Sequence, residues 1–119
     1  ITALGANTFN MGIIGGIVGF YIVIGLVRIL GKTSMRKEYR VTIATAIGSY
    51  IAILLAASVC GVELGLAGAI PMGIAISTMV FWHIFIGIGE AVISGLIIFY
   101  IYKVKPDLII TESYLGVKQ

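Results

Sequence analysis

The chemistry open to this chain is concentrated in its longest apolar stretch, which contains one imidazole and one carboxylate. His83 is the only histidine, and Glu90 is the only formally charged residue within residues 64–102. On a helix, His83, Gly87, Glu90 and Ser94 share one face, because successive members are four, three and four positions apart. Burying either polar group in hydrocarbon costs about 3 kcal/mol or more. We therefore expect both to face the interior of a membrane bundle, each with a partner on another helix.

The composition of the whole chain is that of a membrane protein. Hydrophobic residues make up 60% of its 119 residues, charged residues make up 11%, and the mean hydropathy is +1.14. These values lie outside the range of soluble domains. Basic residues do not alternate with aromatic ones, which argues against nucleic-acid binding. The single Cys60 excludes an internal disulfide and a cysteine-based metal site, so we expect a buried structural thiol.

Hydropathy predicts an all-α, polytopic membrane helical bundle with about three crossings. The expected spans are residues 11–30, 41–62 and 71–102, since a bilayer is crossed by about 20 apolar residues. As one helix the last segment would be roughly 48 Å long, against a hydrocarbon core of about 30 Å. It therefore either tilts and bends near its glycines or begins with a re-entrant piece, residues 71–81. Either form crosses once and leads into a tail of residues 103–119.

The loop between the first two spans is strongly basic, and positive residues beside spans stay on the cytoplasmic side. Its only acid is Glu38, and the basic residues around it are Arg28, Lys32, Arg36, Lys37 and Arg40. We expect this loop inside, the N-terminus outside, and the C-terminus inside with Lys103 and Lys105, so that the tail is cytoplasmic. A lipid or protein partner could use the same charges, but the topology rule already accounts for them.

Polar and small residues near the first two spans allow more than one interpretation. Asn7, Thr8 and Asn10 precede the first span, so a helix cap near Asn10 is favoured, with a polar pocket as the alternative. Gly12 and Gly16 have the spacing that lets a second helix approach closely. A stripe in the second span predicts hydrogen bonds to a neighbouring helix or to its own backbone, with a cavity wall as the alternative. The stripe consists of Thr42, Thr45, Ser49, Ala52 and Ala56.

The segment between the second and third spans is expected to be an outer loop. Helix-breaking residues recur through it, namely Gly61, Gly65, Gly68 and Pro71. This interpretation places Glu63 in the loop.

Two motifs near opposite ends of the chain resemble one family of membrane proteins. Residues 3–12, Ala-Leu-Gly-Ala-Asn-Thr-Phe-Asn-Met-Gly, resemble a stretch midway along the CbiM family, the substrate-binding (S) subunits of energy-coupling-factor (ECF) cobalt transporters. Residues 83–91, His-Ile-Phe-Ile-Gly-Ile-Gly-Glu-Ala, resemble its HxxIGIGEA element, and Val-Lys-Pro-Asp-Leu at residues 104–108 is similar to its basic, Arg-Pro-Asp-Leu ending. Ala-Ile-Gly-Ser-Tyr at residues 46–50 also fits. The nickel-specific NikM proteins are close relatives of this family.

The resemblance implies a multi-spanning subunit that captures Co²⁺ from outside and supplies it for cobalamin synthesis. It implies three partners: a CbiN-like accessory subunit, a CbiQ-like transmembrane coupling subunit and a CbiO-like ATPase. ATP hydrolysis then belongs to the partners, and the chain itself has no nucleophile–base set, HExxH motif or phosphate-binding glycine loop, so we expect no enzyme activity. The alternatives are a nickel-specific S subunit, an accessory or structural subunit without a substrate site, and an S subunit for an organic cofactor precursor.

The resemblance also implies where the metal binds. The family's ligands are a terminal amine, a Met-His start and a further histidine, all upstream of the region matched here. The chain starts at Ile1 and its first residues read as the interior of a protein. We therefore expect the C-terminal half of the fold, or a processed chain, with no metal ligand and no resident cofactor on residues 1–119. Nitrogen ligation of that kind separates Co²⁺ from Ni²⁺ poorly.

The polar residues are accordingly candidates for a pocket rather than for direct metal binding. The pocket candidates are Asn7, Thr8, Asn10, Ser49, His83 and Glu90, and the helix-packing candidates are Gly12, Gly16, Gly87 and Ala91. For His83 and Glu90, polar contacts inside the bundle are favoured over metal ligation, and a chance occurrence or an accessory ion path is the third alternative. We expect Glu90 to tie the last helix to the earlier ones. For Asn7 and Asn10, the resemblance makes a role in a polar pocket as well supported as a role in a helix cap.

Overall fold

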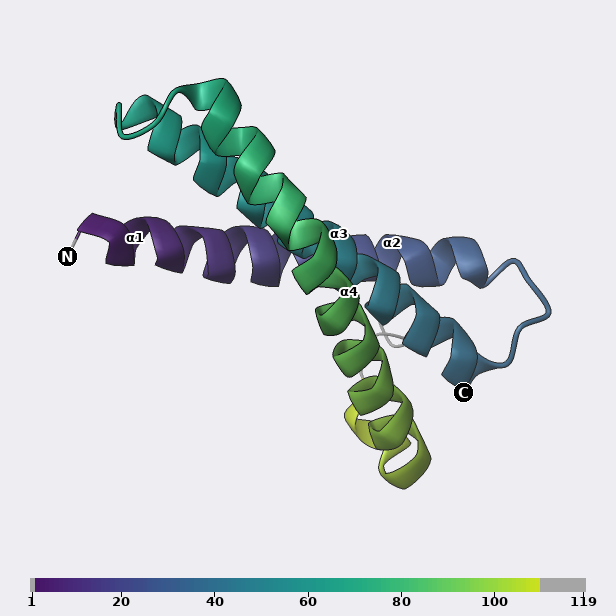
Figure 1. Cartoon of the computed structure of the whole chain (residues 1–119). Coiled ribbons are helices and arrows are strands. Elements are labelled where there is room, and N and C mark those ends of the chain that lie inside the picture. Colours follow the sequence, from purple (N-terminus) through teal and green to yellow (C-terminus); the bar gives the residue numbers. More distant parts are fainter. Residues whose placement is uncertain (1, 110–119) are drawn as a thin grey trace.

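The computed structural model describes residues 2–109, with side chains from Leu4 onward, and every regular element in this range is helical. The elements are α1 (Thr2–Thr8), the π-helix η1 (Phe9–Val18), α2 (Gly19–Leu30), α3 (Lys37–Leu66), α4 (Met72–Val104) and the 3-10 helix η2 (Pro106–Leu108). Because α1, η1 and α2 follow one another without a break, they form one long helix, called the first helix below. Figure 1 shows the first helix crossing α3 and α4 near the middle of all three.

Three helices are long and apolar enough to cross a membrane: Leu4–Leu30, Lys37–Leu66 and Met72–Val104. Helices are the expected solution, because in hydrocarbon every backbone amide and carbonyl must find its partner within the protein. The predicted all-α, polytopic membrane bundle with three crossings is confirmed, and the chain is part of a multi-pass membrane protein. Which end faces the cytoplasm stays a prediction from the basic loop.

The first helix begins earlier than the sequence predicts. The predicted cap near Asn10 is wrong, because the backbone is already helical at Thr2 and Asn10 lies inside η1. The Thr8 hydroxyl donates to the Leu4 carbonyl at 2.8 Å, a bond within the helix and not a cap. A helix start at Asn10 would leave the backbone of the preceding residues without these internal bonds, which is costly beside lipid.

The α3 and α4 helices form a hairpin that closes through glycine. A Cβ atom placed on Gly61 would lie 2.7 Å from Ile76 Cα, and one placed on Gly65 would lie 2.8 Å from Met72 Cα. Only glycine permits backbones to approach this closely. The prediction of an outer loop from Gly61 onward is therefore wrong, since α3 continues to Leu66 and the two glycines pack against α4.

The turn after α3 is short, and α4 is a single helix. Gly68 has a φ of 69°, a left-handed conformation that glycine adopts without strain. Pro71 directly precedes the helix, and residues 72–104 are helical throughout. The re-entrant piece considered for residues 71–81 therefore does not form.

The end of α4 returns to the end of the bundle that carries the basic loop of residues 31–36. Lys103 Nζ lies 4.0 Å from Glu38 Oε1, close to the start of α3. A helix that crosses the membrane once from the turn after α3 ends on the side of the basic loop, as α4 does here. Residues 110–119, most of the predicted tail, lie outside the described residues.

The buried core of the described chain is small. Val27, Val41 and Ala44 are fully buried where the first helix meets α3. Around them pack the partly buried side chains of Val23, Leu26, Leu30, Ile98 and Tyr102. Many large apolar side chains face outward instead, and lipid or neighbouring helices cover such faces in a bilayer.

Candidate functional site

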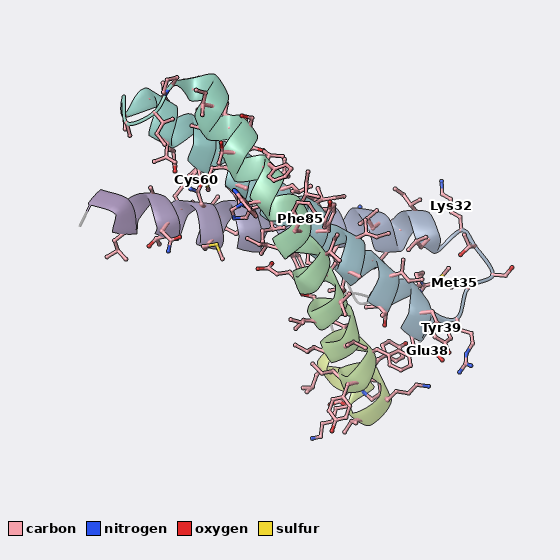
Figure 2. The ribbon with its side chains drawn as sticks, in the orientation of Figure 1. Lys32, Met35, Glu38, Tyr39, Cys60 and Phe85 are labelled. Atoms are coloured by element: carbon pink, nitrogen blue, oxygen red, sulfur yellow. The ribbon has the colours of Figure 1, made fainter. Side chains whose placement is uncertain are left out.

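A half-open cavity lies between the first helix, the second half of α3 and α4 as far as Glu90; because polar side chains stand in its mostly apolar wall, it is called the polar cavity below. Its volume is about 900 Å³. Small and apolar residues form much of its wall, and the side chains with polar or sulfur atoms are Asn7, Asn10, Met11, Cys60, Glu63, Met79, His83 and Glu90. In Figure 2, Cys60 lies toward one end of the bundle, whereas Lys32 and Glu38 lie toward the other. The cavity thus extends from the end opposite the basic loop to the middle of the bundle, because Glu90 lies midway along α4.

One polar contact in the cavity joins the first helix to α3. Asn10 Nδ2 donates to Glu63 Oε2 at 2.7 Å. Asn10 is only 5% exposed, and Glu63 is half-buried. Hydrogen bonds to a charged group are roughly twice as strong as bonds between neutral groups. This contact therefore fixes the first helix against α3 at the cavity wall.

Sequence reasoning placed Glu63 in a loop and missed it as a site residue. The stripe of small and polar residues in α3 continues beyond Ala56 to Cys60 and Glu63, in steps of four and three. Those steps keep all three residues on one helical face, and all three line the cavity. The stripe was the signal that could have identified Glu63. Cys60 is half-buried at this wall rather than fully buried.

His83 makes its hydrogen bond within α4. Its Nδ1 lies 2.6 Å from the Met79 carbonyl oxygen, which can only accept, so Nδ1 carries the proton. The expected partner on another helix is thus replaced by a carbonyl one turn away. In the neutral imidazole this leaves the Nε2 lone pair free to accept a hydrogen bond or to bind a cation.

Glu90 lines the cavity and is exposed. No hydrogen bond or ion pair joins it to another residue in the described part of the chain. The expected tie between Glu90 and the earlier helices is therefore not seen. Between His83 and Glu90, Gly87 packs against α3, where a Cβ atom would lie 2.9 Å from Tyr50 Cδ2 and 3.0 Å from Ile53 Cγ2.

The remaining pocket candidates divide between the cavity and other places. Asn7 lines the cavity and is exposed. Thr8 and Ser49 do not line it, and the Ser49 hydroxyl donates to the Ala46 carbonyl at 3.0 Å.

The helix-packing candidates also differ in their surroundings. The Cβ position of Gly12 has no neighbour within 4 Å, and that of Gly16 meets only the Met11 carbonyl of its own helix. Among residues 2–109, this pair therefore packs against no second helix. Gly87 contacts α3, and Ala91 is half-buried.

The cavity has the charge of a cation site but not the ligand set of a closed metal centre. Two acids, Glu63 and Glu90, line it, and none of the described lining residues is a lysine or arginine. No group of three or more His, Cys, Asp or Glu within residues 2–109 could hold a metal ion. The arrangement attracts cations without a preformed coordination cage.

The sequence pattern of the CbiM family, described as the cobalt uptake substrate-specific transmembrane region, matches residues 1–108. The chain belongs to the CbiM family. The resemblance inferred from residues 3–12 and 83–91 is thereby confirmed, and the three membrane-spanning helices agree with it.

Relatives of this CbiM-family chain carry names that refer to metal transport. A metal transport protein of Methanocaldococcus jannaschii, so named on inference, is 33% identical over 121 residues, covering 95% of this chain and 50% of that protein. A protein of Archaeoglobus fulgidus, named as a fused nickel transport protein on the same basis, is 32% identical over 118 residues, covering 98% of this chain and 37% of that protein. The chain thus spans half or less of these curated relatives. No solved structure shows significant similarity to it.

Proposed function

We propose that the chain forms part of the substrate-binding S subunit of an ECF-type transporter that takes up Co²⁺ for cobalamin synthesis. The observation that carries the proposal is the polar cavity, which lies among the membrane-spanning helices of a CbiM-family chain. Buried polar groups in such helices are costly and commonly mark the path of a substrate or ion. Metal is the substrate here, and the chain needs no resident cofactor.

The distribution of charge supports capture from the outer side. Glu63 and Glu90 line the cavity, and the basic residues of the 31–36 loop lie at the end of the bundle away from Glu63. Basic residues beside spans remain in the cytoplasm, so in this proposal the end of the bundle with Glu63 faces the outside. A cation arriving from there would meet Glu63 before it met the basic loop.

Energy for transport comes from partner subunits in this proposal. The expected partners are a CbiN-like accessory subunit, a CbiQ-like coupling subunit in the membrane and a CbiO-like ATPase. The side chains of the cavity supply binding groups and no catalytic set. The chain would bind and position the metal while ATP is hydrolysed elsewhere in the complex.

A nickel-specific S subunit is the second candidate. One relative that matches 98% of this chain is named for nickel transport. The cavity does not discriminate between the two metals, because carboxylate, amide and imidazole groups bind both Co²⁺ and Ni²⁺. An accessory subunit without a substrate site is less well supported, because that role would not require the polar cavity.

The decisive test is uptake of radioactive cobalt by cells that express the complete reading frame together with its neighbouring genes. We expect saturable Co²⁺ uptake that persists in the presence of excess Ni²⁺. Cells that lack the gene for the ATPase partner serve as the control and should accumulate no cobalt above background. Preferential uptake of Ni²⁺ would favour the nickel-specific alternative, and uptake of neither metal would contradict the transport role.

A further inference from the structure

Acidic and basic side chains are separated along the described bundle. Glu63 lies near the end of α3 and Glu90 lies midway along α4, and both line the polar cavity, while Lys103 and the basic loop of residues 31–36 lie at the end of the bundle away from Glu63. Low-dielectric walls focus the field of such a charge distribution and raise the local concentration of oppositely charged ions. The two carboxylates therefore concentrate cations in the cavity.

Asn10 provides a second and independent feature of the same cavity. It is 5% exposed, and its Oδ1 atom is buried without a hydrogen-bond partner within residues 2–109. A buried amide oxygen without a partner is unfavourable and calls for a ligand or water. The other end of the amide donates to Glu63 Oε2 at 2.7 Å and so orients the carboxylate. Amide and carboxylate oxygens are the donors that hard divalent cations prefer.

We propose that the polar cavity is a vestibule site, which captures a hydrated divalent cation before the cation reaches its transport ligands. The Glu63 carboxylate and Asn10 Oδ1 contact the cation directly or through its water molecules. Glu90, exposed in the same cavity, supplies the second negative charge. This inference rests on the proposed transport function and assigns residues of this chain to its first step.

Such a site attracts cations but selects among them poorly. With two oxygen donors and retained water, it suits Mg²⁺ as well as Co²⁺ or Ni²⁺. No three-residue group of metal-binding side chains completes a coordination cage in the described part of the chain. The vestibule site therefore sets the rate of capture, and Mg²⁺ competes for it, while final affinity is determined elsewhere.

The test is stopped-flow association of Co²⁺ with the complete protein in lipid nanodiscs, without its transporter partners. At low ionic strength, we expect Glu63→Gln to lower the association rate constant by about tenfold. Glu90→Gln should also lower the association rate constant, and this variant leaves the Asn10–Glu63 hydrogen bond intact. The difference from the wild type should disappear in about 1 M salt, where the Debye length is about 3 Å. Added Mg²⁺ should slow association in the wild type and not in Glu63→Gln.

Glu38→Gln is the matched control, because it removes the same charge at the opposite end of the bundle. Its association rate constant should equal that of the wild type. Wild-type rate constants for both Glu63→Gln and Glu90→Gln would overturn the vestibule site, as would an equal decrease in all three variants. Variants are compared only as monodisperse protein. If Glu63→Gln does not fold, the association rate constant of Glu90→Gln alone tests the vestibule site.

The outcome separates the vestibule site from the transport function. Normal wild-type binding of Co²⁺ with unaltered rates in both cavity variants would overturn the vestibule site alone. Slowed association in the variants, together with a complete transporter that accumulates no metal, would overturn the uptake role and support the site. Absence of Co²⁺ binding by the wild-type protein would overturn both.

Discussion

Gly61→Ala is expected to destabilise the complete protein by about 1–3 kcal/mol, the usual cost of overfilling a close-packed contact. The new methyl group would lie 2.7 Å from Ile76 Cα and 3.0 Å from Ile76 N. These are backbone atoms, so no side chain can rotate away to relieve the overlap. The α3–α4 hairpin must open at this point, and the cavity wall near Cys60 and Glu63 moves with it. Thermal unfolding of detergent-solubilised protein measures the loss.

Gly89→Ala is the matched control for this prediction. Gly89 is also a glycine inside a long helix, but no atom of residues 2–109 lies within 4 Å of its Cβ position. Alanine favours a helix over glycine by up to about 1 kcal/mol, so this variant should be as stable as the wild type or slightly more stable. Equal unfolding temperatures for Gly61→Ala and Gly89→Ala would contradict the close approach of α3 and α4.

Asn10→Ala is expected to lower stability by about 1.5–3 kcal/mol, the range for hydrogen bonds to charged groups. The change removes the donor that binds Glu63 Oε2 at 2.7 Å and leaves a half-buried carboxylate without it. Because the bond joins the first helix to α3, we also expect weaker retention of Co²⁺ by the complete protein. Unfolding temperature and retained radioactive cobalt are measured on the same preparation.

The control for Asn10→Ala is Asn7→Ala. Asn7 lines the same cavity but is exposed and has no hydrogen bond to Glu63. Surface substitutions of this kind usually change stability by less than about 0.5 kcal/mol. If the two alanine variants unfold at the same temperature, the Asn10–Glu63 bond does not hold the first helix in place.

The fold class, the number of membrane-spanning helices and one pair of cavity residues could be predicted from the sequence. In hydrocarbon, backbone amides and carbonyls must bond to each other within the protein, so long apolar runs predict helices whatever sequence surrounds them. His83 and Glu90 are conspicuous because a charged or titratable group is rare in such a run. Both line the cavity of the folded chain. The family could also be inferred, because its motifs are local in the sequence.

The structure alone identified the partners of these residues. Asn10 and Glu63 are separated by 53 positions, and no local pattern indicates that they meet. His83 binds a carbonyl of its own helix instead of a distant side chain. A hydrogen-bond partner depends on which helix faces lie together, and that is a property of the packed bundle.

Two glycine pairs illustrate the same division between sequence and structure. Gly12 and Gly16 have the same four-residue spacing as Gly61 and Gly65. Only the second pair packs against another helix among the described residues. Spacing determines that two glycines share a helix face, because a helix has a fixed period. Whether a second helix covers that face depends on how the helices cross, which only the tertiary structure decides.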